Sequence, residues 1–380
     1  MTHFIHIFLF EEGVCLTTEV NYLVIISIII LIALLVPFES HFNKYVKYSI
    51  VIVSLLPLSI IASIRSIGTD TTSYQRIFIN QDIINFSQYS FLELFSSRYE
   101  PGFLLIISIL KSLSLDYRAM FFVFFLIPIF LIIYVVNKAE IKNILLIYTL
   151  FLLAYLLKGP MDIIRHFFAA ALYLSALLAI AQRKKLRTLL NVGLASIFHY
   201  SSLVIFAILP FFKIKWTTKR YLFFLIVAFL SGTLLKGALS NGIPIFTDSE
   251  FAFIEKAQLY VSSEFSSENI IKDTLLNFMM IMPVVLNILI ALFGLKLLMN
   301  VKDNFISILL KAQIMGTLIS VFLMSTGSLI AGYRMDFLLS IGNFLLMYYI
   351  ISYSKQRNQI YVFLLFIYYL IAYNIVLIIY

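Results

Sequence analysis

The chain of 380 residues is 62% hydrophobic and only 12% charged, and its net charge is +9. A soluble domain is usually about half apolar and about a quarter charged, so this composition excludes a water-soluble globular protein. The single cysteine, Cys15, excludes an intramolecular disulfide framework and a cysteine-based metal site. We therefore expect a polytopic membrane protein. Helices are expected rather than a barrel, because the apolar runs are long and continuous.

Apolar runs long enough to cross a membrane recur along the chain, since a spanning helix needs about twenty residues. We expect spans over residues 20–37, 48–64, 119–136, 143–157, 161–181, 220–236, 274–298, 305–330, 335–351 and 360–380. Two segments fit poorly, because residues 102–115 are short and residues 188–212 are interrupted by the polar sequence FHYSS. The sequence predicts an all-α single transmembrane domain, residues 1–380, with about 10–12 transmembrane helices and short half-embedded helices.

The basic residues between the predicted spans indicate the orientation of the chain. They cluster at residues 44–47, 138–142, 182–187, 213–220, 302 and 354–359. All can face the cytoplasm, as the positive-inside rule requires, only if the two poorly fitting segments do not cross the membrane. We expect residues 102–115 to be half-embedded from the outer side and residues 188–212 to be a re-entrant helix pair with His199 near its tip. Irregular backbone at membrane depth lines cavities, so this arrangement predicts a cavity that opens outward.

The acidic residues have the opposite distribution. On this topology only Glu39, Glu140 and Asp303 lie inside, and the other sixteen of the nineteen lie outside or at the outer boundary. Most of these belong to two outer, periplasmic loops, residues 65–100 and 237–273, which are longer than ordinary connections. The second loop is expected to contain an amphipathic helix near residues 250–260. The asymmetry indicates a working surface on the outer side.

The first candidate site residues follow the second predicted span, in the sequence SIRSIGTDTTSYQRIF. Arg65 lies at the outer end of the span, and Asp70 with the two threonines after it can cap a helix. The sequence SSRYEPGF then places Arg98 and Glu100 before the short apolar segment, where the helix dipole favours a carboxylate. A snorkelling arginine and a capped short helix explain the first stretch equally well, and a capping acid is the alternative for Glu100.

Further candidates lie in or near predicted spans. Asp162 is three and four residues before Arg165 and His166, so the three can share a helix face. Ionisable residues inside a span are functional candidates, and the alternative here is an internal Asp–Arg pair that fixes the helix end. His199 interrupts the suspected re-entrant segment and is either functional or a hydrogen-bonded structural residue.

The sequence GSLIAGYRMDFLLSIG contains the last candidates. Tyr333, Arg334 and Asp336 mark an expected outer end between two spans, with a snorkelling arginine as the alternative.

Four arginines therefore lie on the outer side against the positive-inside trend: Arg65, Arg98, Arg165 and Arg334. Arginine forks bind phosphate oxygens in a bidentate way, so the four indicate an anionic ligand. The chain has no D-x-D or H-x-x-x-H sequence, which favours metal-independent chemistry without a cofactor. Walker A, nucleophile-elbow and dinucleotide fingerprints are also absent from the sequence, and no nucleic-acid partner is expected.

These same residues carry a family resemblance. The chain resembles the EpsG family of the Wzy-type bacterial polysaccharide polymerases over about residues 20–340. The matching blocks are R-x-x-G-T-D-T-x-x-Y at Arg65–Tyr74, a Glu before a Gly at Glu100–Gly102, I-R-H at Ile164–His166 and F-H-Y-S at Phe198–Ser201. The family more often has Arg-Gln in the third block and a proline or similar residue after the histidine of the fourth, where this chain has His166 and Tyr200.

The resemblance implies a GT-C-like membrane glycosyltransferase whose active site faces the periplasm from the bacterial inner membrane. Such polymerases transfer a growing glycan from undecaprenyl pyrophosphate to a new lipid-linked repeat unit, making O-antigen, capsule or exopolysaccharide. The implied partners are the undecaprenyl-pyrophosphate-linked donor and acceptor glycans and membrane lipids, with a chain-length regulator protein as a further candidate.

The implied reaction assigns expected roles, because charge builds up on the leaving pyrophosphate and a base must accept the proton of the attacking hydroxyl. For pyrophosphate we expect Arg165 and Arg334, then Arg65 and Arg98. For the base we expect His199 and Glu100, then Asp70. Substrate contacts are expected from Tyr74, His166, Tyr333 and Asp162. An outer-face glycan ligase, a flippase for lipid-linked oligosaccharides, a membrane acyltransferase and a non-catalytic scaffold remain as alternatives.

Overall fold

The computed structural model describes residues 18–65, 70–83, 99–240, 270–298 and 301–354. Every regular element in these ranges is helical. In chain order the elements are α2 (Thr18–Leu35), the 3-10 helix η1 (Val36–His41), α3 (Lys44–Ile64), α4 (Thr71–Asn80), α6 (Pro101–Ser112), α7 (Tyr117–Lys138), α8 (Ile144–Tyr155), α9 (Ile164–Ala181), α10 (Lys185–Phe198), η3 (Tyr200–Leu203), α11 (Val204–Ile208), η4 (Leu209–Lys213), α12 (Thr218–Ser240), α14 (Ile270–Leu297), α15 (Asn304–Ser325), α16 (Leu329–Leu339) and α17 (Asn343–Tyr353).

The described helices confirm the predicted class, an all-α polytopic membrane protein. Seven of them are long and apolar enough to span a membrane: Asn21–His41, Lys44–Ile64, Tyr117–Lys138, Ile164–Ala181, Thr218–Gly237, Met280–Leu297 and Asn304–Ser325. The predicted single span over residues 335–351 is wrong in form, because α16 and α17 are two helices that meet at a 60° bend. The span predicted over residues 360–380 and most of the loop over residues 237–273, with its amphipathic helix, lie outside the described residues.

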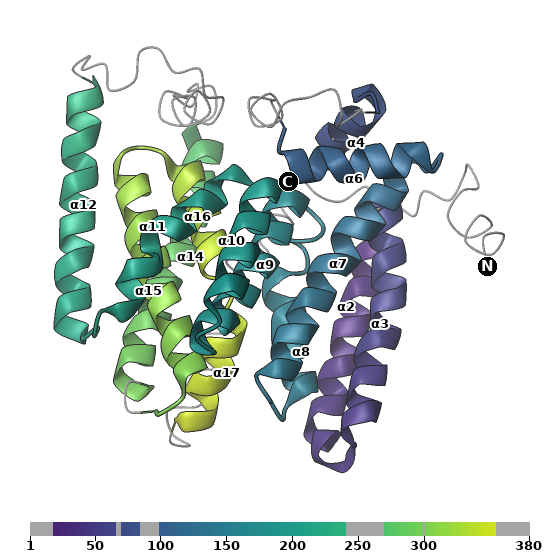
Figure 1. Ribbon diagram of the computed structural model, residues 1–380, viewed down its shortest axis with the longest axis horizontal. Helices are drawn as coiled ribbons and strands as arrows, with labels where there is room; N and C mark the ends of the chain where they lie inside the picture. Colours follow the sequence, from purple (N-terminus) through teal and green to yellow (C-terminus); the bar gives the residue numbers. More distant parts are fainter. Residues whose placement is uncertain (1–17, 66–69, 84–98, 241–269, 299–300, 355–380) are drawn as a thin grey trace.

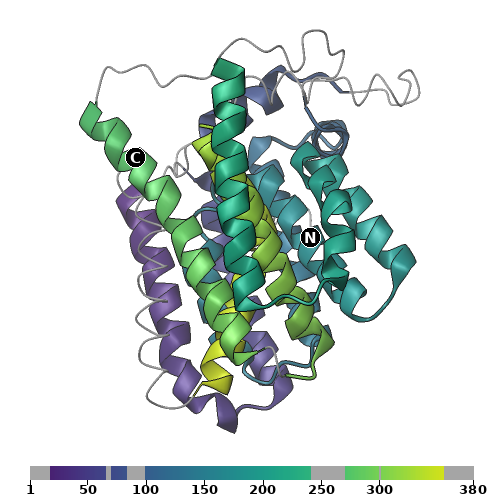
Figure 2. The same cartoon turned by 90° about the vertical axis from the view of Figure 1, so that its left-hand side faces the viewer.

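The long helices run side by side, and α4 and α6 lie near one end of the bundle (Figure 1). The connection from α2 through η1 to α3 lies at the opposite end (Figure 1). Figure 2, seen from the side, shows α12 standing at the surface of the bundle with α14 crossing obliquely beside it. We call the end that contains α4 and α6 the α6 end.

Helix α9 is the centre of the bundle. It packs against α7, α10, α15 and α16, and 83% of its residues are buried inside the protein. Small side chains make this close packing possible, since alanines let helix backbones approach one another in a membrane. Those alanines are Ala169–Ala171, Ala176 and Ala179, all fully or almost fully buried.

The segment that begins with α10 is interrupted at His199. Helix α10 packs against α9 and α6 and ends at Phe198, and His199 then adopts an extended conformation with φ −157°. The chain continues through η3, α11 and η4, where Lys311 of α15 donates a hydrogen bond to the carbonyl of Phe212 at 2.7 Å. Neither arm meets the length requirement of a span, so His199 lies at the turn between two short arms.

Close packing of α12 against α15 depends on Gly232, because an added Cβ there would lie 1.8 Å from the Ser325 Oγ and 2.5 Å from the Phe322 carbonyl oxygen. We expect Gly232→Ala to destabilise the protein by about 1–3 kcal/mol through overpacking. Thermal unfolding of the purified protein in detergent measures this effect. Gly237→Ala on the same helix is the control, since its Cβ would meet nothing within 4 Å. Equal unfolding temperatures for the two variants would contradict the prediction.

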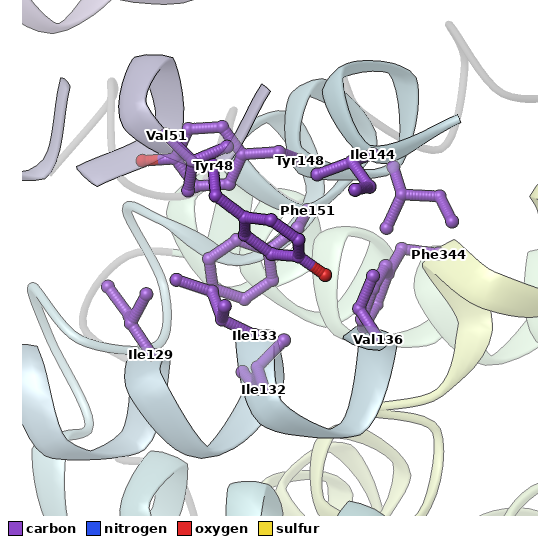
Figure 3. A pocket seen from close by; sticks show the side chains of 11 residues that line it. Tyr48, Val51, Ile129, Ile132, Ile133, Val136, Ile144, Tyr148, Phe151 and Phe344 are labelled. Atoms are coloured by element: carbon purple, nitrogen blue, oxygen red, sulfur yellow. The ribbon is translucent and has the colours of Figure 1, made fainter. Parts of the chain in front are cut away.

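A small apolar cavity lies where α3, α7, α8 and α17 meet (Figure 3). Its volume is about 20 Å³, and its lining includes Val51, Ile132, Phe151 and Phe344, with the ring of Tyr48 projecting among them. Such a volume suits at most a single water molecule. The cavity is therefore a packing defect and not a place for a sugar or a lipid.

Candidate active site

Glu100 brings together three segments that are far apart in the sequence. It directly precedes α6, where Pro101 occupies the first helical turn and fits its fixed backbone angle. The Oε1 of its carboxylate lies 3.1 Å from the Nδ1 of His199, and Oε2 accepts a hydrogen bond from the Nη1 of Arg165. Arg165 comes from the first turn of α9, and His199 follows α10. Two of the predicted base candidates and one predicted phosphate ligand therefore form one cluster, the Glu100–Arg165–His199 cluster.

Gly102 explains how α6 approaches the end of α10 closely enough to make this cluster. An added Cβ would lie 2.8 Å from the Cγ2 of Ile197 and 3.1 Å from its carbonyl oxygen. Any larger residue would push α6 away, since close packing of this kind leaves no room for a methyl group. The glycine that follows Glu100 by two positions therefore sets the distance between Glu100 and His199.

The charge state of Glu100 determines the tautomer of His199. Burial alone would raise the pKa of Glu100, but the charge of Arg165 and the hydrogen bond with His199 outweigh it and lower the pKa to about 2. An ionised carboxylate only accepts hydrogen bonds, so the Nδ1 of His199 must carry the proton that it donates to Glu100. Burial lowers the pKa of His199 below its ordinary 6.5, which keeps the ring neutral at pH 7. The Nε2 of His199 therefore holds a lone pair that can accept a proton.

Arg165 is surrounded by aromatic rings. Its Cζ lies 5.5 Å from the ring centre of Tyr74, 5.9 Å from that of Tyr99 and 5.1 Å from that of Phe103. Guanidinium groups stack favourably on aromatic faces, and these rings fix its orientation. The Nε of Arg165 has no hydrogen-bond partner among the described residues. This nitrogen is inaccessible to solvent, so a ligand can reach the Arg165 side chain only through its other, partly exposed atoms.

The exposed fractions of the three side chains indicate different roles for the members of the cluster. The side chains of Arg165 and His199 are 19% and 18% exposed, whereas that of Glu100 is 3% exposed. Arg165 and His199 can therefore meet a ligand, while Glu100 supports them from behind. His166 lies further inside, 3% exposed, with its ring centre 4.5 Å from that of His199 and 5.7 Å from that of Phe337.

A second cluster is built on the turn between α8 and α9. The Nζ of Lys158 lies 2.7 Å from the Oδ2 of Asp162, and it also lies 5.3 Å from the ring centre of Tyr333. The Oδ1 of Asp162 accepts a hydrogen bond from the backbone N–H of Asp70 at 3.2 Å. Asp162 thus joins the start of α4 to the start of α9. The alternative of an Asp162–Arg165 pair is wrong, because Asp162 precedes the helix, pairs with Lys158 and leaves Arg165 to Glu100.

Arg65 supports the same turn from inside the protein. It is 3% exposed, its Nη1 donates a hydrogen bond to the carbonyl of Pro160 at 2.6 Å, and its Cζ lies 4.0 Å from the ring centre of Phe121. Its Nε and Nη2 have no hydrogen-bond partner among the described residues. In this position Arg65 holds the turn that carries Lys158 and Asp162.

The remaining predicted residues fall in different places. Asp70 makes no side-chain cap of α4, and burial together with the charge of Asp162 raises its pKa. On α16, Tyr333 is buried beside Lys158 and Arg334 is half-buried. The prediction that Asp336 marks an outer helix end is wrong, because its side chain is fully buried and accepts a hydrogen bond from the Nδ2 of Asn287. Arg98 lies outside the described residues.

Sequence reasoning missed Lys158. The signal for it was present, because it is a single cation at the end of a predicted span, away from every basic cluster assigned to the cytoplasm. Only arginines were counted on the outer side. Among the described residues, no group of three or more His, Cys, Asp or Glu residues could hold a metal ion.

Lys158→Met should destabilise the protein by about 3–5 kcal/mol, because it leaves the fully buried Asp162 carboxylate without its cation. Adding Asp162→Asn should restore much of the loss, since no lone charge then remains buried. Thermal unfolding of the single and double variants in detergent tests this. Lys138→Met, at an exposed position, serves as the control. A single variant as stable as the wild type would show that the pair does not stabilise the fold.

Comparison with known proteins supplies the family. The model of the EpsG family matches residues 47–380, which include every residue of both clusters. The searches of curated proteins and of solved structures gave no match to the chain. Since the family model covers most of the chain, the resemblance in the sequence blocks is confirmed. The protein belongs to the EpsG family of polysaccharide-polymerase-like membrane proteins.

Proposed function

We propose that this protein is a metal-independent glycosyltransferase that polymerises undecaprenyl-pyrophosphate-linked repeat units at the outer face of the bacterial inner membrane. The observation that carries the proposal is that one ionised carboxylate, Glu100, binds both His199 and Arg165. His199 is neutral and can accept a proton, and Arg165 supplies a positive charge beside it. The family membership supports the choice of a glycan polymer as product.

In the proposed step, a hydroxyl oxygen of the acceptor sugar attacks the anomeric carbon of the donor. A new carbon–oxygen bond forms, the bond from that carbon to the phosphate oxygen breaks, and undecaprenyl pyrophosphate leaves with the electron pair. The Nε2 of His199 accepts the hydroxyl proton as general base. Glu100 fixes the ring and stabilises the imidazolium that forms, which makes it a positioning residue.

Positive charge near the leaving group supports the second half of the step. The side chain of Arg165 is 19% exposed and is held in place by the Glu100 carboxylate, which makes it the first choice for the pyrophosphate. Arg334 and Lys158 lie on neighbouring segments and add cations to the same end of the protein. Preorganised cations stabilise charge that develops in the transition state more than they stabilise the ground state. Tyr74 and Tyr99 flank Arg165 and offer faces for sugar stacking.

The proposed orientation rests on the basic residues. Lys44 and Lys47 begin α3 beside η1, and Lys138 and Lys142 flank the turn between α7 and α8. The Lys47 Nζ donates a hydrogen bond to the carbonyl of Lys142, so these two turns lie together at the end opposite α6. Basic turns face the cytoplasm in most inner-membrane proteins, which favours an outward-facing α6 end.

The pH dependence of the reaction follows from His199. Its neutral form is the base and its pKa lies below 6.5, so the rate should be constant near pH 7 and fall as the pH drops through that lowered pKa. Glu100, with a pKa of about 2, stays ionised across this range. Single-turnover rates with purified protein and a lipid-linked repeat unit between pH 5 and pH 8 measure the profile. An acidic limb centred above pH 6.5 would exclude this assignment.

Glycan profiling of a gene deletion tests the function. We expect single repeat units on the lipid carrier or on their final acceptor and no long chains. Complementation with the wild-type gene should restore long chains, and a His199→Gln gene, expressed to the same level, should not. Unchanged chain lengths in the deletion would refute the proposal. Loss of every transferred glycan, single units included, would indicate a ligase or a flippase instead.

A further inference from the structure

The break between α16 and α17 lies deep inside the protein. The two helices meet at a 60° bend, and residues before, within and after the break, Leu339, Ile341 and Phe344, are at most 1% exposed. A helix end leaves its last carbonyl groups without partners inside the helix, and its partial negative charge favours a cation. Discontinuous membrane helices use such ends, together with polar side chains, to bind small cations.

Polar side chains from four helices meet at this break. The Nδ2 of Asn287, on α14, donates a hydrogen bond to the Oδ2 of Asp336 at 2.5 Å, and the Nδ2 of Asn343, on α17, donates one to the Oδ1 of Asn287. The Nε2 of Gln313, on α15, donates one to the backbone carbonyl of Asn287 at 3.2 Å. All four side chains are at most 1% exposed. We call these residues the Asp336 network.

Two amide oxygen atoms of the network lack hydrogen-bond partners among the residues that the structure describes. They are the Oδ1 of Asn343 and the Oε1 of Gln313, both inaccessible to solvent. Each is on an amide group whose nitrogen donates to Asn287, and the side chain of Asn287 in turn binds the Asp336 carboxylate. Buried polar atoms are satisfied in almost all proteins, and each exception in a native structure calls for a ligand or another cause. Here the two unsatisfied atoms are acceptors in a network that also contains an acid.

From this arrangement we infer that the Asp336 network is a binding site for a dehydrated monovalent cation, with Na⁺ as the ion of choice. Hard cations take carboxylate, amide and carbonyl oxygens as ligands. The network offers one carboxylate and neutral amide oxygens. One positive charge balances the single negative charge of the Asp336 carboxylate. A divalent ion would leave one uncompensated positive charge in the protein interior.

A proton fits this site less well than a cation. Protonation of Asp336 neutralises one oxygen atom but leaves the Oδ1 of Asn343 and the Oε1 of Gln313 without partners. A cation bound among them would instead be shared by the carboxylate and the amide oxygens. The inference concerns a site apart from the Glu100–Arg165–His199 cluster and holds whatever glycan the protein transfers.

The bound ion would fix the helix that carries Tyr333 and Arg334. Asp336 lies two residues after Arg334 on α16, and Asn343 begins α17, so one ion joins both halves of the broken helix to α14 and α15. Its binding free energy adds directly to the stability of the folded protein. The ion is therefore a structural ligand that sets the position of the Arg334 segment.

Thermal unfolding of the purified protein in detergent tests the inference. Replacing choline chloride by NaCl at equal ionic strength should raise the unfolding midpoint by several degrees, and MgCl₂ at the same ionic strength should not. Direct binding of radioactive sodium should saturate at one ion per chain. Asp336→Asn keeps the shape of the side chain and should abolish both responses. Glu39→Gln is the control, because Glu39 is also a buried carboxylate but lies beside Lys47 at the other end.

A second variant keeps the test decisive if Asp336→Asn does not fold. Gln313→Met retains the volume of the side chain and removes only an amide ligand, so it should weaken sodium binding at least about tenfold while the protein still folds. Equal stabilisation by choline, sodium and magnesium salts, or saturable sodium binding that survives both variants, would overturn the site. Stabilisation by lower pH without any response to sodium would show that Asp336 binds a proton instead.

Discussion

Glu100→Gln is expected to reduce the rate of glycan transfer by about 10³–10⁴-fold, because the change removes the acceptor that fixes the tautomer of His199. The glutamine keeps the shape of the side chain, but its amide can donate to Nδ1, which turns the lone pair of His199 away from Nε2. It also leaves Arg165 without its carboxylate partner. The measurement is single-turnover transfer with a lipid-linked repeat unit.

A pH profile separates this positioning role from simple unfolding. Glu100 raises the pKa of His199 against the larger effect of burial, so the residual activity of Glu100→Gln should show its acidic limb at lower pH than the wild type. Asp116→Asn is the matched control, because Asp116 lies at the other end of α6 and its half-exposed carboxylate only caps α7. A Glu100→Gln rate within tenfold of the wild type would remove Glu100 from the mechanism.

Arg165→Ala is expected to abolish chain lengthening while the protein still accumulates in the membrane. Loss of one preorganised group that stabilises the negative charge of the leaving group lowers the rate about 10²–10³-fold. Because a long chain needs many transfers, the effect on chain length is larger still. Arg165→Lys should rescue only partly, because a lysine cannot bind Glu100 and a phosphate through one planar fork. Glycan length profiling in a complemented deletion strain gives the readout.

The control for Arg165 is Arg118→Lys at the start of α7. Arg118 also lies near an acid, with its Nε 3.9 Å from the Oδ2 of Asp116, and its Cζ is 6.0 Å from the ring centre of Tyr117, both at the start of α7. It should produce chains of normal length. Long chains from Arg165→Ala, at wild-type protein levels, would show that Arg165 does not serve the reaction.

The class of the fold and the members of the site could be predicted from the sequence because both leave local signals. Long apolar runs predict spanning helices, Arg165 and His199 stand out as polar residues within apolar stretches, and Glu100 stands directly before one. Their partners could not be predicted, because pairing depends on which helices pack together. Asp162 is close to Arg165 in sequence, yet it binds Lys158, since α9 begins only after it.

Other details were beyond a single sequence for the same reason. Residues 335–351 have the composition of one span, and nothing in their sequence indicates the break between α16 and α17. Both helices pack against α14 and α15, which come from other parts of the chain. Asn287, Gln313 and Asn343 are amides scattered over three helices, and no sequence spacing relates them to Asp336. The position of Arg65 behind the α8–α9 turn depends likewise on the ring of Phe121, far along the chain.

The placement of the cluster at the end of the bundle bears on how long a product could become. Glu100, Arg165 and His199 all lie at helix ends, and the side chains of Arg165 and His199 are partly exposed. A glycan made at such a partly exposed site would extend into water. Its length would then not be limited by the size of an internal cavity. The length of the polymer would then be a kinetic quantity, set by how many transfers occur before the lipid carrier dissociates.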